Sequence, residues 1–123
     1  MKRSSPKRDY SDYIIDIAES IENIENFIKG FYLESFRKDQ KTVFAVVRAL
    51  EIIGEAAVKM PAFVKNKYKE IPWKDISGMR NKLIHEYFGV NVAVVWKTIE
   101  EDLPGLKVKI SEILKDLRVK KLI

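Results

Sequence analysis

The sequence contains no cysteine and a single histidine, His85. Without cysteine, neither a disulfide framework nor a thiolate zinc site can form, and one imidazole cannot build a histidine-rich metal site. No apolar run approaches the roughly 18 to 20 residues of a membrane span, and no hydrophobic stretch follows the basic N-terminus. We therefore expect a cytoplasmic protein that uses no metal or other cofactor and does not act at a membrane.

Charge is concentrated near the two ends of the chain. The net charge is +5, but residues 1–8 carry four cations and residues 115–121 a net +3, which leaves residues 9–114 at −2. Basic ends can attract RNA or another acidic partner through long-range electrostatics, or they can simply keep the ends solvated. At 123 residues, we expect one folded domain over residues 10–117, with basic tails at 1–9 and 118–123.

Two segments of the first half have helical spacing. The first predicts an amphipathic helix that ends near Gly30, because its apolar residues recur at steps of three and four. These residues are Ile14, Ile17, Ile21, Ile24, Ile28 and Phe31. The second segment, from about Asp39 to Met60, is apolar around most of its circumference and belongs in the centre of a bundle. Its polar stripe, which faces solvent or a polar cleft, consists of Arg48, Glu51, Glu55 and Lys59.

A third helix is expected to begin near Trp73. Pro72 is suited to the first turn of a helix, and a carboxylate such as Asp75 stabilises the positive N-terminal end.

A last helix is expected from Asn91, whose side chain can cap it, to Leu117. Because its three-four spacing continues through Pro104, we expect a kinked continuous helix more than two separate ones, with a break after Asp102 as the alternative. No segment shows the sustained alternation of apolar and polar residues that is typical of a β-strand. The predicted fold class is therefore all-α, an antiparallel bundle of four to five helices in a single domain.

The stretch from Trp73 to Asn91 contains an arginine in an unusual place. When residues are projected at 100° per position, Arg80 falls in the middle of an apolar arc. An arginine there needs a partner, because an unpaired buried charge loses several kcal/mol of hydration. That partner is either a carboxylate of the preceding long helix, Glu55 or Glu51, or a phosphate from outside.

His85 and Asn81 flank this arc, and Tyr87 lies within it. A neutral imidazole can take the proton of a 2′-hydroxyl near pH 7 while a guanidinium neutralises the phosphorane, so Arg80 and His85 suit RNA cleavage without a metal. Asn81 can orient the imidazole, and Tyr87 can bind a phosphate or accept a modification. Taken singly, each also fits an ordinary structural role as a packed or locally bonded side chain.

On an ideal helix, Arg80 and His85 diverge by about 140°. One straight helix cannot easily aim both side chains at a small site. Either the helix is distorted near His85, or a second subunit completes the cleft.

This stretch resembles the HepT family of the HEPN superfamily, whose signature is an arginine, four residues, a histidine, one residue and a tyrosine. Arg80, His85 and Tyr87 match the signature position by position. The strings IPWKDISGMRN (71–81) and ALEIIGEAA (49–57) are similar to the family as well. The resemblance covers nearly all of residues 10–117.

The resemblance implies a homodimeric, HEPN-like ribonuclease toxin that cuts RNA without a metal, with Arg80 and His85 as catalytic residues. Asn81, Tyr87 and Glu55 are the expected supporting residues. It also implies a toxin–antitoxin pair, in which a minimal nucleotidyltransferase antitoxin transfers AMP from ATP to Tyr87, and in which the two proteins can form a larger hetero-oligomer. A bulky anionic adduct at Tyr87 would repel RNA phosphates.

Two other hypotheses remain open at the level of sequence. The motif can be a docking and modification site for a nucleotidyltransferase in a binding module that cleaves nothing. Alternatively, the chain is a purely structural bundle that oligomerises through apolar faces, with Arg80 in a salt bridge and His85 packed. Replacement of His85 separates the three hypotheses.

Overall fold

The computed structural model describes the backbone of residues 9–85 and 91–119 and the side chains of residues 9–79 and 91–118. These residues form helices and no strand, which confirms the all-α class. The helices are α1 (Tyr10–Phe27), α2 (Leu33–Lys38), α3 (Gln40–Lys59), α4 (Ala62–Lys67), α5 (Trp73–His85), α6 (Val92–Glu101) and α7 (Leu103–Val119). Helix α7 thus extends into the segment predicted as a C-terminal tail.

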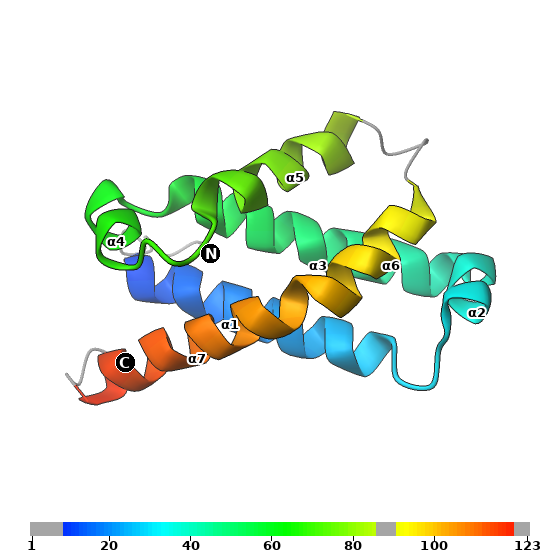
Figure 1. Ribbon diagram of the computed structural model, residues 1–123, viewed down its shortest axis with the longest axis horizontal. Helices are drawn as coiled ribbons and strands as arrows, with labels where there is room; N and C mark the ends of the chain where they lie inside the picture. The colour runs from blue at the N-terminus through cyan, green and yellow to red at the C-terminus, as the bar shows by residue number, and fades with distance from the viewer. Residues whose placement is uncertain (1–8, 86–90, 120–123) are drawn as a thin grey trace, which may run out of the picture.

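The long helices pack as an antiparallel bundle around α3 (Figure 1). Helices α1 and α5 both pack against α3, and α7 packs against α1. The short helices α2 and α4 lie at opposite ends of the bundle (Figure 1). Both helices predicted in the first half supply the core: the fully buried residues include Ile14, Ile17, Ile21 and Ile24 of α1 and Val46, Leu50 and Ile53 of α3. No helix in the described part of the chain has the length and apolarity needed to cross a bilayer.

Local capping sets where the first helices begin and end. Asp9 and Asp12 form a reciprocal capping box at the start of α1. The Asp39 carboxylate accepts a hydrogen bond from the backbone N–H of Thr42 at 3.0 Å, which caps α3. Helix α1 ends at Phe27, three residues before the predicted end, and Gly30 has a φ of 81° that L side chains rarely adopt.

The two six-residue helices were not predicted, because neither is long enough to show a periodic pattern. Each is held by one buried side chain. Phe36 of α2 is fully buried and packs on Trp96 of α6, with ring centroids 5.0 Å apart. In α4 this role belongs to Val64.

The prediction of one kinked helix through Pro104 was wrong. The chain forms two helices, and Asp102 separates α6 from α7. Proline lacks an N–H and its ring collides with the carbonyl four residues earlier, so Pro104 is tolerated at the start of a new helix but not inside an old one. The alternative of a break at Asp102 is the observed arrangement. The apolar phase survives the break, because Ile99, Leu103 and Ile110 are all buried.

Candidate active site

Helix α5 carries the candidate residues, and its first turn is firmly fixed. The Trp73 side chain is buried, and its indole N–H donates a hydrogen bond to the backbone carbonyl of Tyr68 at 3.0 Å. The Ser77 hydroxyl donates back to the Trp73 carbonyl at 2.9 Å. The predicted start at Trp73 is confirmed.

The backbone of α5 remains α-helical as far as His85. Arg80, Asn81 and His85 therefore lie on one uninterrupted helix, although their side chains lie outside the described part of the structure. Tyr87 lies outside the described residues altogether. Sequence analysis left two ways in which Arg80 and His85 could serve one small site, a distorted helix or a second subunit. The backbone shows no distortion of α5 before His85.

Burial along the first turns of α5 defines an inner and an outer face. Trp73 and Ile76 are buried, whereas Lys74 and Gly78 are exposed. At 100° per residue, position 80 has the register of Trp73 and Ile76, and position 85 has the register of Lys74 and Gly78. The positions of the two candidate catalytic residues are therefore on different sides of the same helix.

A groove of about 760 Å³ lies between α5 and the α6–α7 pair, with α3 as its floor. Met79, the residue immediately before Arg80, lines it together with Gly78. The remaining lining is apolar toward α3 and mixed in charge at the rim, where the charged residues are Lys74, Asp75, Glu101, Asp102 and Lys109. The groove thus extends along α5 up to the candidate motif.

Glu55, a predicted supporting residue, already has a partner on its own helix. Arg48 Nη1 lies 3.5 Å from Glu55 Oε1 and 3.4 Å from Glu51 Oε1. The polar stripe predicted on α3 is therefore an intrahelical ion-pair network with a partly exposed arginine. No described contact joins Glu55 to α5, so its supporting role stays a prediction.

Gly78 is a residue that our sequence reasoning missed. It lies inside α5, where glycine destabilises a helix by roughly 0.5–1 kcal/mol relative to alanine. A Cβ atom built there would meet no atom within 4 Å. Packing within the described part of the chain therefore does not explain the glycine. The available signal was a glycine within an otherwise helical pattern, where it costs stability relative to alanine.

Comparison with known proteins places the chain in a family. Residues 17–113 match the family model described as "Ribonuclease HepT-like". A protein of Thermococcus cleftensis named "Probable ribonuclease HepT" is 53% identical over 109 residues, which are 89% of this chain and 99% of that one. No solved structure matches.

More distant relatives carry similar names. A "Putative RNase" of Methanocaldococcus jannaschii is 44% identical over 115 residues, covering 94% of this chain and 95% of its own. Another, from Caldanaerobacter subterraneus, is 45% identical over 102 residues, covering 83% and 91%. The matched regions include all of α5. The chain belongs to the HepT-like ribonuclease family of the HEPN superfamily.

Proposed function

We propose that the protein is an endoribonuclease toxin that cuts RNA without a metal ion, with Arg80 and His85 at the reacting phosphate. Membership of a ribonuclease family supports the reaction class. The observation that carries the assignment is that α5 holds the only imidazole of the chain and Arg80 five residues apart on one continuous helix, beside a groove.

The chemistry requires a base, a stabilising cation and an acid. The neutral His85 imidazole takes the proton of the RNA 2′-hydroxyl, whose oxygen then attacks the adjacent phosphorus. Arg80 neutralises the extra negative charge of the phosphorane, which a guanidinium does well because it binds two oxygens at once. The 5′-oxygen leaves with a proton from an imidazolium, and the products carry a 2′,3′-cyclic phosphate and a 5′-hydroxyl.

We further propose that the working unit is a homodimer. Positions 80 and 85 lie about 140° apart around α5, so one copy carries them on different sides of the helix. A second copy related by two-fold symmetry can bring its own motif to the same cleft, and a C2 interface uses the same surface patch on both subunits. One cleft would then hold Arg80 and His85 side chains from both subunits.

The other candidate residues take supporting roles in this proposal. Asn81, one turn before His85, orients the imidazole or binds a phosphate oxygen. Tyr87 contributes a hydroxyl to the cleft. Glu55 is engaged by Arg48 on its own helix and has no described contact with α5, which makes it the weakest of the three candidates.

Control by a nucleotidyltransferase antitoxin completes the proposal. Transfer of AMP from ATP to the Tyr87 hydroxyl forms a phosphodiester to the tyrosine and releases pyrophosphate. The adduct places a negative charge and a nucleotide in a cleft that must accept RNA phosphates, so repulsion and bulk both oppose substrate binding. A stable hetero-oligomer of the two proteins is part of this proposal.

The test is to express the protein without any partner and to compare cell growth and total RNA integrity for wild type and His85→Ala at matched soluble levels. Lys97→Ala, a change at an exposed lysine of α6, is the matched control. We expect growth arrest and fragmented RNA for wild type and for the control, and neither for His85→Ala. Purified wild-type protein should cut RNA in excess EDTA.

Each contrary result has a distinct meaning. Retained toxicity of a folded His85→Ala protein would reject His85 as the base. Loss of cleavage in EDTA that a divalent cation restores would reject the metal-free mechanism. Intact RNA with the wild-type protein, together with binding of a nucleotidyltransferase, would favour the docking module that cleaves nothing.

A further inference from the structure

One side of α3 is left largely uncovered by the other described helices. Helices α1 and α5 both pack against α3, and α6 and α7 cross in front of it in the view of Figure 1. The remaining side carries Phe44, Arg48, Glu51, Glu55 and Val58, which we call the open face of α3. These residues recur at steps of four, three, four and three, so they form a stripe about 21 Å long on one side of the helix.

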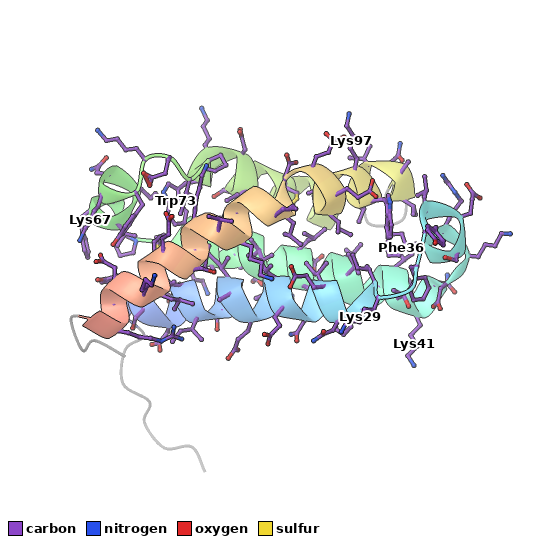
Figure 2. All side chains as sticks on the ribbon, turned by 60° about the horizontal axis from the view of Figure 1, so that its bottom comes forward. Lys29, Phe36, Lys41, Lys67, Trp73 and Lys97 are labelled. Carbon is purple, nitrogen blue, oxygen red and sulfur yellow. The ribbon has the colours of Figure 1, made fainter. Side chains whose placement is uncertain are left out.

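The open face exposes much apolar surface for a solvent-facing stripe. Phe44 is 49% exposed and Val58 is 47% exposed. Among the helices that the structure describes, α3 alone carries two exposed large apolar side chains. Lys41, one turn before Phe44, points away from the bundle on the side opposite Lys97 of α6 (Figure 2). A helix that is apolar around most of its circumference is normally buried, so another molecule is expected to cover this side of α3.

Charged side chains in the middle of the open face are only loosely paired. Arg48 Nη1 lies 3.4 Å from Glu51 Oε1 and 3.5 Å from Glu55 Oε1. Strong pairs between a guanidinium and a carboxylate have N–O distances of about 2.7–2.9 Å. The Arg48 side chain is also 63% exposed. Its guanidinium can therefore exchange the carboxylates of its own helix for those of another molecule.

The order of these residues is self-complementary when the helix is turned end for end. Phe44 and Val58 lie seven residues to either side of Glu51, while Arg48 precedes it by three and Glu55 follows it by four. In an antiparallel pair of α3 helices with a two-fold axis near Glu51, Arg48 of each copy faces Glu55 of the other. Each Phe44 then lies near the other copy's Val58, and both guanidiniums flank the Glu51 carboxylates. Charge complementarity therefore selects a second copy of this chain as the occupant.

An antiparallel pair also brings the two candidate motifs to the same side of the dimer. Its two-fold axis runs across the helices within the interface, and a rotation about that axis keeps each flank of α3 on its own side. Because α5 packs along one flank, both copies of α5 lie on that side. A parallel pair would place them on opposite sides. The axes of packed helices lie about 8–10 Å apart, so a copy seated on the open face lies beside α5, which carries Arg80 and His85.

We propose that the open face of α3 is the contact surface of the homodimer, in which Arg48 of each copy binds Glu55 of the other. This inference rests on the proposed function, to which it adds the surface and the antiparallel orientation through which two copies form one cleft. It assigns Glu55 a role in assembly.

The test asks whether two variants that do not dimerise alone dimerise together. Arg48→Glu and Glu55→Arg each turn both contacts of a homodimer into like-charge pairs. Mixed in equal amounts, they restore both contacts between the copies, whereas the pair inside each α3 stays repulsive. Recovery on mixing therefore reports contacts between copies and not the ion pair within one helix. Sedimentation equilibrium gives the Kd, and native mass spectrometry separates the heterodimer from the homodimers.

We expect each variant alone to raise the dimer Kd by about tenfold or more, because two symmetry-related pairs become repulsive at once. The mixture should form the heterodimer with a Kd within about threefold of that of the wild-type dimer. The matched controls are Arg37→Glu and Glu34→Arg, which reverse an exposed ion pair within α2. Both should dimerise as wild type does, alone and mixed.

A second pair of variants tests the apolar part of the open face. Val58→Glu should raise the dimer Kd by a similar factor, because it places a carboxylate against the Phe44 ring of the second copy. Val108→Glu is its matched control, since Val108 is 59% exposed on α7, away from the open face (Figure 1). Circular dichroism should show the same helix content for all variants, because every replaced side chain is at least partly exposed.

Four results would overturn this interface, and they differ in what they leave standing. Variant dimers as tight as wild type would place the second copy elsewhere and keep the homodimer. Two helical variants that stay monomeric on mixing would reject the pairing of Arg48 with Glu55. A monomeric wild type that still cuts RNA would reject the homodimer and keep the reaction. Tight variant dimers that no longer bind a nucleotidyltransferase would assign the open face to that partner.

Discussion

Gly78 and His85 lie seven residues apart on α5, so their Cα atoms are within about 20° of each other around the helix axis and about 10 Å apart along it. Alanine at position 78 would fit the subunit, since an added Cβ meets nothing within 4 Å. Position 78 therefore has open space on the same side of α5 as position 85. A glycine there lets another molecule approach the helix backbone closely.

Replacement of Gly78 by alanine should separate stability from assembly. We expect the isolated subunit to gain roughly 0.5–1 kcal/mol of unfolding free energy, because alanine is the better helix former. Dimerisation, measured by analytical ultracentrifugation, and RNA cleavage should both weaken, because the added methyl group lies at the proposed approach of the second copy. Gly105→Ala in α7, also with open space around its Cβ, is the control and should change neither. A fully active Gly78→Ala dimer would show that the second copy binds elsewhere.

Replacement of Tyr87 by phenylalanine should prevent nucleotidyl transfer without unfolding the protein. The change removes only the hydroxyl that accepts the AMP group in our proposal. Intact-mass spectrometry after incubation with the partner enzyme and ATP should show the adduct on wild type and on Tyr32→Phe, but not on Tyr87→Phe. An adduct of the same mass on Tyr87→Phe would move the acceptor to another side chain.

Replacement of Phe36 by alanine should cost about 3–5 kcal/mol of unfolding free energy, as expected for truncating a fully buried aromatic side chain. The ring packs on Trp96 and attaches α2 to α6, so its loss leaves a cavity between those helices. Urea unfolding followed by circular dichroism measures the effect. Tyr32→Ala, only four residues away but largely exposed, should change the stability by less than about 0.5 kcal/mol. Similar values for the two variants would contradict the packing of α2.

Replacement of Tyr68 by phenylalanine should cost about 0.5–1.5 kcal/mol, because the variant cannot donate the 2.9 Å hydrogen bond to Asp116. The loss should be localised at the end of α7, where hydrogen exchange of the backbone amides should become faster. The amides of α3 should be unaffected. Uniformly faster exchange along the chain would mean that the contact supports the whole bundle and not one junction.

Periodicity was sufficient to predict the long helices. The spacing of the isoleucines in α1 and the apolar circumference of α3 each have a direct counterpart in the buried core, and Asn91 caps α6 as predicted, with its side chain 3.2 Å from the Val94 N–H. The short helices were missed because six residues contain less than two turns, and their existence depends on tertiary anchors such as Phe36. The break at Asp102 was misjudged because the spacing of apolar residues shows which side of a helix is buried. It does not show whether the backbone continues as one helix.

The sequence predicted the helix that carries the candidate residues, and their roles stay predictions. The sequence placed Arg80, Asn81 and His85 on one helix, and the backbone of α5 agrees. The sequence offered Glu55 or Glu51 as a partner for Arg80. In the structure both carboxylates lie close to Arg48 instead, which the spacing alone could not predict because it depends on side-chain rotamers along α3. The groove beside Met79 was also inaccessible to sequence reasoning, because it is formed by helices that are distant in the chain.

The packing of α1 against α7 joins the first helix to the last. Leu117, near the end of α7, is almost fully buried, so the core is incomplete until that residue is in place. During synthesis, the bundle cannot close until the last turn of α7 has left the ribosome. A nascent chain should therefore stay sensitive to proteolysis until α7 has emerged and packed against α1, and α5, which carries the candidate residues, belongs to a bundle whose core is incomplete before that moment.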